Sequence, residues 1–443
     1  MRTLFGTDGI RGNADRDLPS DLVLAIGRAA AAQLVHGSDH PKIIIGRDTR
    51  MSSLAIENVL ARGLVTGGAD VVRCGVLPTP GVAFLVADIG AAAGAVISAS
   101  HNPYEDNGIK FFGPGGFKLP DDVELAIEKL IAAESYPDGI EAGSDNELAD
   151  ASGRYVAQAL ASLEAVSLGG MKIVVDCANG AAYKTTPAAL EKAGAEVIVI
   201  NDVPDGRNIN HGCGSTHPEA VARVVLEVGA DVGIAHDGDA DRVIAVDEKG
   251  KVVDGDAMIA ALAIDMSRRK ALKGDQVVVT VMANTGFRKA MREHGIRMVE
   301  TPVGDRYVLE AMLREDANLG GEQSGHVIFT DFATTGDGLI TALRFLALAS
   351  TSGKKLSQLN QVIDRYPQVL LNVKVSGSRK LEDSALVKAA IDEASSKLGE
   401  AGRVLVRASG TEPLVRVMVE AAEQAEATSH AERIADVVRT ELG

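Results

Sequence analysis

Three carboxylates occupy every second residue of the segment Asp237-Gly238-Asp239-Ala240-Asp241-Arg242. In an extended or turning loop this spacing aims alternate side chains at one point, and hard oxygen ligands suit Mg²⁺ or Ca²⁺. Aspartate-rich segments are also common as solvated turns, but here apolar strand-like runs lie directly before and after the carboxylates. Carboxylates held between buried strands would repel one another, so the sequence favours a bound cation. An EF-hand is excluded because its further ligands and closing glutamate are missing.

A second polar segment, Ser98-Ala99-Ser100-His101-Asn102-Pro103, follows an apolar run. Serine-rich segments are usually turns, and the G-x-S-x-G elbow of hydrolases is absent. A serine that faces the carboxylate cluster could instead carry a phosphoryl group polarised by the cation. Lys110 follows within the same stretch. Its ordinary alternative is an exposed lysine on a strand.

Two further segments have the composition of ligand-binding loops. Residues 320–326 place Glu322, Ser324 and His326 among glycines, which suits contacts with sugar hydroxyls, although Gly-Gly turns and structural histidines are common. Residues 407–416 combine two arginines with hydroxyls and a glycine, and such a turn binds phosphate through backbone N–H groups and guanidinium forks. Near the N-terminus, Arg11 lies in another glycine-rich turn and supplies a further basic group.

These segments belong to a repeated layout of strand, helix, strand, helix and strand, which indicates an internal repeat. The three predicted strands lie at 42–46, 68–72 and 95–97 in the first copy, at 172–176, 195–200 and 232–235 in the second, and at 277–281, 296–299 and 317–319 in the third. Alternating strands and helices predict parallel sheets, in which ligands bind beyond the carboxyl ends of the strands. In each copy the third strand leads into a polar segment, so we expect the three segments to share one cleft.

The last part of the chain breaks this pattern. It has a strand at 369–373, a helix through 385–391, two short strands at 403–406 and 414–419, and a final helix over 426–441. This order predicts a small α+β domain that begins near residues 365–367.

Composition limits the function further. A chain of 443 residues suggests about three domains. With 45 Lys and Arg against 61 Asp and Glu, the net charge is −16, which argues against nucleic acid or an anionic membrane as a general partner. An anionic substrate stays compatible if basic residues gather locally. Three scattered cysteines predict buried thiols in a reducing cytoplasm, and no apolar run reaches the length of a membrane span or signal sequence.

Together and in order, the segments 5–12, 98–103, 237–242, 321–326 and 407–413 resemble the α-D-phosphohexomutase family across essentially the whole chain. The resemblance implies an α/β fold: three similar α/β domains with mixed, largely parallel sheets and a C-terminal α+β domain around a central cleft. The implied domains are 1–152 for the phosphoserine, 153–254 for the metal, 255–366 for the sugar and 367–443 for the phosphate.

The resemblance also implies roles for individual residues. The catalytic candidates are Ser100 as the phosphorylated serine, Lys110, Arg11, His101 and His326. Mg²⁺ would be held by Ser100, Asp237, Asp239 and Asp241. The substrate-binding candidates are Arg242, Glu322, Ser324, Arg407, Ser409, Gly410, Thr411 and Arg416.

The implied activity is that of a cytoplasmic isomerase that moves a phosphoryl group through phosphoserine and a sugar bisphosphate. Gln323 and the short aspartate segment resemble members that interconvert glucosamine 6-phosphate and glucosamine 1-phosphate, which feeds UDP-N-acetylglucosamine and cell-wall synthesis. The alternatives are a phosphomannomutase or phosphoglucomutase, a metal-dependent sugar phosphatase, and a non-catalytic sugar-phosphate sensor. A homodimer is consistent with the resemblance, although the sequence identifies no interface.

Overall fold

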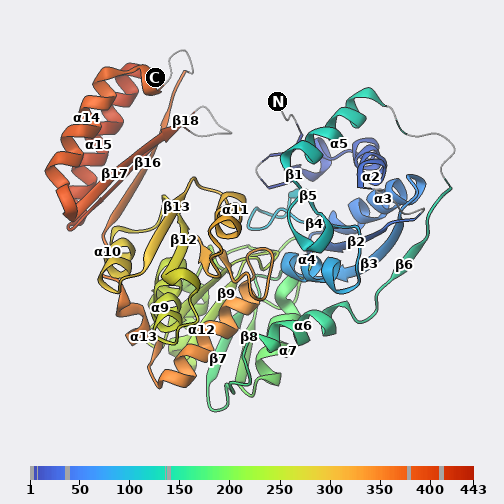
Figure 1. The fold of residues 1–443 in the computed structure, drawn as a ribbon, viewed down its shortest axis with the longest axis horizontal. Helices are drawn as coiled ribbons and strands as arrows, with labels where there is room; N and C mark the ends of the chain where they lie inside the picture. The colour runs from blue at the N-terminus through green and yellow to red at the C-terminus, as the bar shows by residue number, and fades with distance from the viewer. Residues whose placement is uncertain are drawn as a thin grey trace. The chain divides into compact units, whose positions relative to one another are not determined.

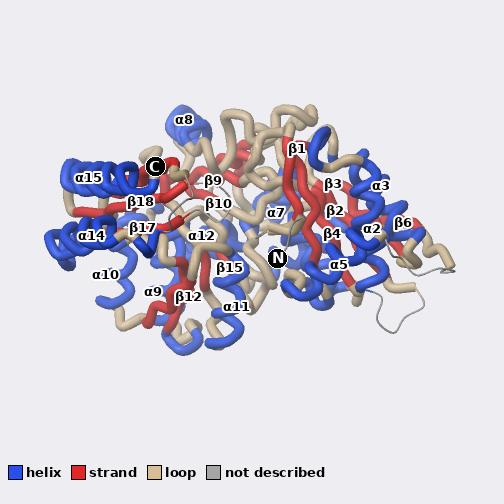
Figure 2. Tube along the Cα trace, turned by 90° about the horizontal axis from the view of Figure 1, so that it is seen from above, coloured by secondary structure: helices blue, strands red, loops and turns tan. Residues whose placement is uncertain are grey.

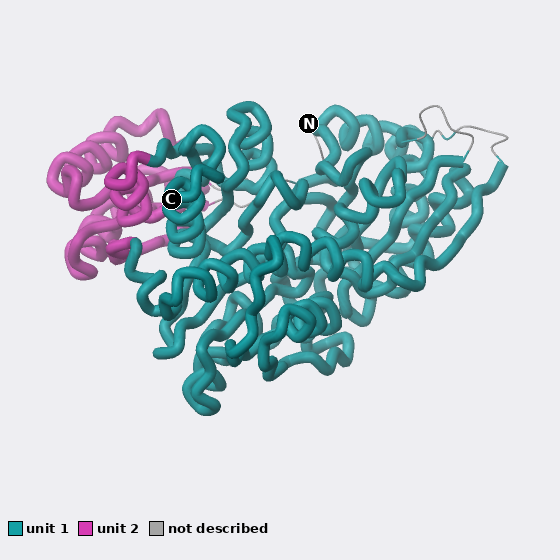
Figure 3. The backbone as a smooth tube through the Cα atoms, turned by 60° about the horizontal axis from the view of Figure 1, so that its bottom comes forward, with its two compact units in different colours: residues 1–282, 296–362 teal, residues 283–295, 363–443 magenta. Residues whose placement is uncertain are grey.

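The computed structural model describes residues 4–6, 8–34, 40–134, 136, 141–376, 381–408 and 414–443. The chain divides into two compact units, which Figure 3 colours separately. Unit 1 contains residues 1–282 and 296–362, and unit 2 contains residues 283–295 and 363–443.

The first sheet of unit 1 has six strands in the order β1 (Ile10–Asn13), β5 (Asp106–Phe112), β4 (Ala93–Ile97), β2 (Lys42–Arg47), β3 (Asp70–Val76) and β6 (Asp145–Glu147). The Ile43-Ile44-Ile45 run of β2 is fully buried, as expected for a strand covered on both faces. Helices α2 (Ser20–Leu34), α3 (Ser53–Thr66) and α5 (Asp121–Ala133) contribute to the core cluster on one face (Figures 1 and 2). Val82 of α4 (Thr79–Asp88) packs against β2 and β4, where only Gly46 and Gly94 leave room for it.

The second and third sheets repeat this design. The second has the order β11 (Val252–Val253), β10 (Val243–Asp247), β9 (Val232–His236), β7 (Lys172–Asp176) and β8 (Glu196–Ile200), and the third has β13 (Arg297–Thr301), β12 (Gln276–Thr280), β14 (Gly320–Gly321) and β15 (Val327–Ile328). In every copy the first strand pairs in parallel with both the second and the third, and the third is followed by an antiparallel strand. The predicted repeat and mixed, largely parallel sheets are confirmed.

The remaining helices of unit 1 are α1 (Ala14–Asp17), α6 (Ala151–Ala161), α7 (Thr185–Lys192), α8 (Glu219–Val228), α9 (Gly255–Arg268), α11 (Asp305–Glu315), α12 (Gly338–Ser352) and α13 (Leu356–Leu359). They alternate with the strands, as the sequence predicted (Figure 1). No helix among the described residues has the length and apolar content that a membrane span requires.

One predicted strand is wrong in position. The third strand of the third copy comprises Gly320 and Gly321 instead of residues 317–319. Asn318 is instead fixed by its side chain, which donates to Ala271 O at 2.9 Å and to Asp331 Oδ2 at 2.7 Å. A Cβ at Gly320 would lie 2.7 Å from Val278 O, so the close approach of β14 to β12 requires glycine there.

Unit 2 is the predicted α+β domain with one addition. Its antiparallel sheet has the order β16 (Gln368–Lys374), β18 (Leu414–Ala421) and β17 (Gly402–Ala408), and it packs with α14 (Ala385–Leu398) and α15 (Gln424–Leu442). The helix α10 (Thr285–Glu293) also belongs to this unit. The fully buried Glu420 explains this: it accepts hydrogen bonds from the Thr285 N–H and hydroxyl at 2.9 and 2.6 Å and pairs with Arg403 at 2.8 Å.

All three cysteines are free thiols. Cys177 and Cys213 are buried as predicted, whereas Cys74 is only half-buried. The difference arises because β6 pairs with β3 only over Val71–Arg73, so the following residues of β3 have no strand beside them on that edge within the described part of the chain.

Candidate active site

The predicted metal ligands lie in the turn between β9 and β10. Asp237, Asp239 and Asp241 are at most 4% exposed, and each offers a carboxylate oxygen within 4.8 Å of the others. Ala240 between them has a left-handed backbone with φ of 57°, which turns the chain tightly enough to converge the side chains. Two buried oxygens, Asp239 Oδ1 and Asp241 Oδ1, have no hydrogen-bond partner among the described residues. Orphaned hard oxygens in a convergent cluster fit a divalent cation.

The three aspartates of this turn have pKa values shifted in different directions. Burial, together with repulsion from the neighbouring carboxylates, raises the pKa of Asp237 and of Asp239. Burial also opposes ionisation of Asp241, but His326, Lys110 and Arg242 outweigh it and lower the pKa of that group. Burial and mutual repulsion therefore disfavour the ionised forms of Asp237 and Asp239, and a bound cation would favour them.

Ser100 lies just beyond the carboxyl end of β4 and faces the aspartate turn. Its hydroxyl donates to Asp237 Oδ2 at 2.6 Å and lies 3.3 Å from His101 Nδ1. Ser100 has φ of 51°, and its N–H donates to the Ser98 hydroxyl at 2.9 Å. A left-handed backbone at a residue other than glycine stores strain, which is typical of a side chain held for function. Burial first, and then nearby Arg242 and Arg11, lower the pKa of His101 to about 4, so its imidazole is neutral.

The strained turn is held by residues that the sequence analysis missed. The Arg50 guanidinium is buried, pairs with Asp48 at 2.8 Å and donates to the carbonyl oxygens of Ser100 and Asn102, each at 2.9 Å. Asn210 donates to the Ser100 carbonyl as well, at 2.9 Å. These contacts join distant segments, so no local spacing in the sequence indicated them.

Lys110 points from β5 toward the same cluster, and its alternative as an exposed strand lysine is wrong. Its Nζ lies 3.0 Å from Asp8 Oδ2 and 3.8 Å from both Asp239 Oδ2 and Asp241 Oδ2. Burial opposes the charge, but these carboxylates outweigh it and raise the pKa of Lys110. Arg11 pairs with Asp8, and its pKa is raised in the same way, against burial. Both groups are therefore fixed positive charges beside the aspartate turn.

The third polar segment contributes His326, Glu322 and Ser324. His326 is buried, with Nδ1 3.6 Å from Asp241 Oδ2, and its Nε2 accepts the Gly336 N–H at 3.1 Å. Burial opposes protonation, yet Asp241, Asp305 and Glu322 raise the pKa of His326. Glu322 is half-exposed; its oxygens accept the Gly304 N–H at 3.2 Å and the Ser324 hydroxyl at 3.4 Å. Ser100, the aspartates, Lys110 and His326 thus come together in unit 1.

Arg242 follows the aspartate turn directly and is placed beside it. Its Nε lies 3.8 Å from Asp241 Oδ1. Burial opposes its charge, but the three aspartates and Glu322 raise its pKa further. Thr79 at the start of α4, which no motif in the sequence indicated, also contacts the turn: its hydroxyl donates to Asp239 Oδ2 at 2.6 Å.

The predicted phosphate-binding arginines lie in unit 2. Arg407 of β17 and Arg416 of β18 are direct cross-strand partners. Burial and the neighbouring Arg416 lower the pKa of Arg407, and like charges directly opposite each other weaken a sheet, so a bound anion would stabilise the pair. Ser409, Gly410 and Thr411 lie outside the described residues.

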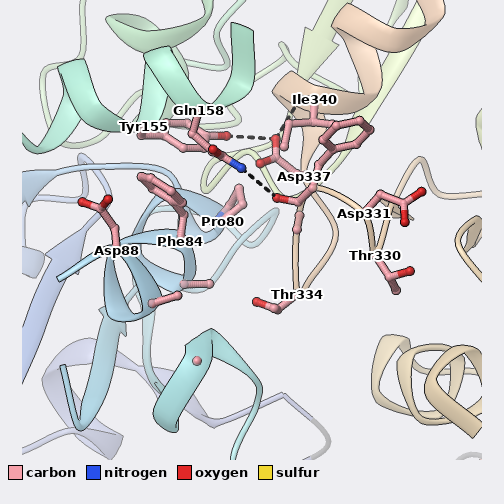
Figure 4. Close-up of a pocket in the computed structure, with 15 residues that line it drawn as sticks. Pro80, Phe84, Asp88, Tyr155, Gln158, Thr330, Asp331, Thr334, Asp337 and Ile340 are labelled. Atoms are coloured by element: carbon pink, nitrogen blue, oxygen red, sulfur yellow. Dashed lines mark hydrogen bonds between the residues drawn. The ribbon is translucent and has the colours of Figure 1, made fainter. Parts of the chain in front are cut away.

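A separate cavity of about 400 Å³ lies between α4, α6 and the loop leading into α12 (Figure 4). Phe84, Tyr155 and Ile340 line it together with the carboxyl group of Asp337, which accepts the Tyr155 hydroxyl at 2.9 Å. No residue predicted for catalysis, metal or substrate lines this cavity. The candidate site is therefore defined by the converging side chains and not by this cavity.

Asp337 provides a prediction about stability. It caps α12 by accepting the Ile340 N–H at 2.9 Å, and burial raises its pKa to about 6. The carboxyl of the unfolded chain has a pKa near about 4. Ionisation of Asp337 therefore lowers the free energy of unfolding progressively between about pH 4 and pH 6, and the free energy stays lowered above pH 6. Asp337→Asn cannot ionise, so from pH 5 to pH 8 the variant gains about 1–2 kcal/mol relative to the wild type. Calorimetric melting temperatures at several pH values measure this; a difference independent of pH would contradict it.

Comparison with known proteins covers the whole chain. Family models described as phosphoglucomutase/phosphomannomutase match as follows: alpha/beta/alpha domain I over residues 2–138, domain II over 153–250, domain III over 254–366 and the C-terminal domain over 370–437. The chain is 52% identical to a phosphoglucosamine mutase of Carboxydothermus hydrogenoformans over 427 residues, 96% of each chain, and 51% identical to that of Thermobifida fusca over 446 residues, 100% of this chain and 99% of the other. A crystal structure of a phosphoglucomutase/phosphomannomutase family protein from Burkholderia thailandensis has a TM-score of 0.82 at 25% identity, covering 99% of this chain and 98% of that one.

Proposed function

The chain belongs to the phosphoglucomutase/phosphomannomutase family of α-D-phosphohexomutases, and from this membership we propose that it interconverts glucosamine 6-phosphate and glucosamine 1-phosphate. The observation that carries the reaction type is the Ser100 hydroxyl, 2.6 Å from Asp237 within a cluster of three buried aspartates. Full-length identity of about one half to phosphoglucosamine mutases supports the amino-sugar substrate.

Ser100 carries the phosphoryl group that is transferred. A hydroxyl oxygen of the sugar phosphate forms a bond to phosphorus as the bond to Ser100 Oγ breaks, and the hydroxyl proton passes to the serine oxygen. The product is a sugar bisphosphate, whose other phosphate returns to Ser100 in the reverse sense. Lys110 and Arg11 stay charged throughout and oppose the negative charge of the transferring group. His101, 3.3 Å from the Ser100 hydroxyl, and His326, beside Asp241, are the imidazoles proposed to exchange protons.

Asp237, Asp239, Asp241 and the phosphate of Ser100 would hold Mg²⁺, which supplies positive charge against the phosphoryl oxygens. The orphaned oxygens of Asp239 and Asp241 support this ligand set. Arg242 lies beside the cluster and is the substrate-binding candidate on this side of the site.

The remaining proposed substrate-binding residues lie in the segments 322–324 and 407–416. In unit 1, Glu322 and Ser324 have half-exposed polar side chains suited to sugar hydroxyls. In unit 2, Arg407 and Arg416 bind the phosphate that the substrate already carries, together with Ser409, Gly410 and Thr411. The proposed domains are 1–152, 153–254, 255–366 and 367–443, and the proposed location is the cytoplasm, as the free thiols support.

Turnover of competing substrates tests the proposal. We expect kcat/KM for glucosamine 6-phosphate to exceed that for mannose and glucose phosphates by at least about tenfold, because the charged ammonium group of glucosamine makes stronger, charge-assisted hydrogen bonds to an acidic side chain than the neutral hydroxyl of the hexoses. A preference for either hexose phosphate would favour the phosphomannomutase or phosphoglucomutase alternative. Release of inorganic phosphate without a requirement for sugar bisphosphate would favour the phosphatase.

A further inference from the structure

Six buried or nearly buried ionisable side chains of unit 1 form a closed ring in which acidic and basic groups alternate. In order, this charge ring contains Asp8, Lys110, Asp241, His326, Asp305 and Lys118. Three members, Asp8, Asp305 and Lys118, have no role in the mechanism given above. The ring joins the N-terminal turn and β5 to the aspartate turn and to the start of α11, so it crosses all three α/β repeats.

The half of the ring that holds Lys118 has the shorter contacts. Lys118 Nζ lies 2.6 Å from Asp8 Oδ1 and is also ion-paired with Asp305. The other oxygen of Asp8 lies 3.0 Å from Lys110 Nζ. Asp305 Oδ2 lies 3.6 Å from His326 Nε2. Lys118 is therefore the only ring member that contacts both Asp8 and Asp305, and each of these carboxylates next touches a group proposed to act in phosphoryl transfer.

Lys118 and Asp8 are both held in their ionised forms. Burial opposes the charge of Lys118, but Asp305 and Asp8 outweigh it and raise its pKa. Burial likewise opposes ionisation of Asp8, yet Lys110, Lys118 and Arg11 hold its pKa well below the ordinary value. Removing Lys118 would leave two partly buried carboxylates, with side chains 23% and 17% exposed, that attract the nearest remaining cations. A partly buried charge that loses its partner is unfavourable. For Asp8 these cations are Lys110 and Arg11. For Asp305 the nearest ring member is His326, whose Nε2 accepts the Gly336 N–H in this structure and must release that hydrogen bond and take up a proton before it pairs with Asp305.

We propose that Lys118 and Asp305 are positioning residues: by neutralising Asp8 and Asp305, Lys118 leaves Lys110 directed at the aspartate turn and His326 directed at Asp241. The inference rests on the proposed function, because the groups it positions are those that serve phosphoryl transfer there. Lys110 lies 3.8 Å from its two aspartates but only 3.0 Å from Asp8, so a stronger pull from Asp8 would act directly against the catalytic placement.

Lys118 could also act only by holding neighbouring segments together. This role can be tested apart from its charge, because other contacts also hold the chain around Lys118. Arg306 donates to Leu119 O at 2.9 Å and pairs with Glu124 at 3.1 Å. The Thr334 hydroxyl donates to Gly116 O at 2.5 Å. Thr334 lies outside the charge ring and carries no role in catalysis or binding, so Thr334→Val is a matched control for a lost contact between these segments.

Kinetics of the full-length protein test the proposal. We expect Lys118→Met to lower kcat by about 100-fold while KM changes by less than about threefold, because misplaced catalytic groups reduce turnover more than binding. The double variant Lys118→Met with Asp305→Asn should have a kcat about tenfold higher than that of Lys118→Met alone, because His326 no longer faces an uncompensated carboxylate. Thr334→Val should keep kcat within about twofold of the wild type.

Three outcomes would overturn the proposal: wild-type kcat in Lys118→Met, an equal fall in Thr334→Val, or a double variant no better than the single one. Lys118→Arg and Asp305→Asn serve as second variants if Lys118→Met does not fold; the former should keep most of the activity and the latter should lose about tenfold in kcat. A crystal structure of the variant gives a readout besides activity, namely displacement of Lys110 Nζ and of the His326 ring. If the wild type turns over no sugar phosphate, the proposed function fails, whereas an active wild type with an unaffected Lys118→Met defeats the positioning role alone.

Discussion

We expect Ser100→Ala to abolish both the interconversion of glucosamine phosphates and the covalent phosphate on the protein. The hydroxyl that the variant lacks is the atom that would carry the phosphoryl group, and it lies 2.6 Å from Asp237. The Ser98 hydroxyl in the same turn is not a substitute, because it donates to Asp48 at 2.7 Å and accepts the Ser100 N–H at 2.9 Å. We expect a fall in kcat/KM of at least about 10⁴-fold, as for other catalytic nucleophiles.

Intact-protein mass spectrometry with peptide mapping measures the covalent part of this prediction. The wild type should carry one phosphate on the peptide that contains Ser100, and the alanine variant none. Ser98→Ala is the matched control: it loses a hydrogen bond in the same turn but keeps Ser100, so its phosphate should stay on Ser100 even if turnover falls. An unphosphorylated alanine variant with full activity would refute the phosphoserine mechanism.

We expect Asp239→Asn to have opposite effects on the stability of the metal-free protein and on the activity of the enzyme. Burial and the neighbouring carboxylate disfavour the charge at Asp239, and its Oδ1 has no hydrogen-bond partner in the described structure. Neutralising it relieves repulsion, so the melting temperature without metal should rise. The same change removes one oxygen ligand, so Mg²⁺ should no longer stabilise the protein, and kcat should fall by about 10³-fold.

Thermal unfolding with and without Mg²⁺ after treatment with a chelator tests this second prediction. At a Mg²⁺ concentration of 100 times Kd, the wild type should gain about 2.7 kcal/mol in stability, and Asp239→Asn far less. Asp247→Asn is the matched control, since Asp247 is equally buried but lies at the far end of β10 from the aspartate turn. An unchanged Mg²⁺ response in Asp239→Asn would show that the cluster does not hold the cation.

The two predictions depend on one structural principle of this fold. Each repeat ends its third strand in a polar segment, and the segments from the three repeats meet: Ser100 contacts Asp237, and Asp241 lies beside His326. A serine on one repeat is thereby brought to carboxylates on the second and an imidazole on the third. Because the three repeats share one topology, each has a loop at the carboxyl end of its third strand, where ligands bind in such sheets. Three copies of one unit can therefore supply three loops to one site.

The sequence by itself determined the strands, the repeat and the local groups of chemistry. The isoleucine run of β2 and the valine run of β12 predict buried strands because both faces are covered. Asp237, Asp239 and Asp241 are close in space because they are close in the chain, and their alternation converges them in any tight turn. Such features depend on contiguous residues, so they could be predicted without knowing the rest of the fold.

Only the tertiary structure decided which distant charges share a site. Lys118 lies 110 residues from Asp8 in the chain, and Arg50 lies 50 residues from Ser100, so no spacing rule pairs them. Two further features also depend on contacts between distant segments. The position of β14 at Gly320 depends on the hydrogen bond from Asn318 to Ala271, and the place of α10 in unit 2 depends on the hydrogen bonds between Thr285 and Glu420. A buried charge must find an opposite charge wherever the packed chain brings one, and that choice is made by the fold as a whole.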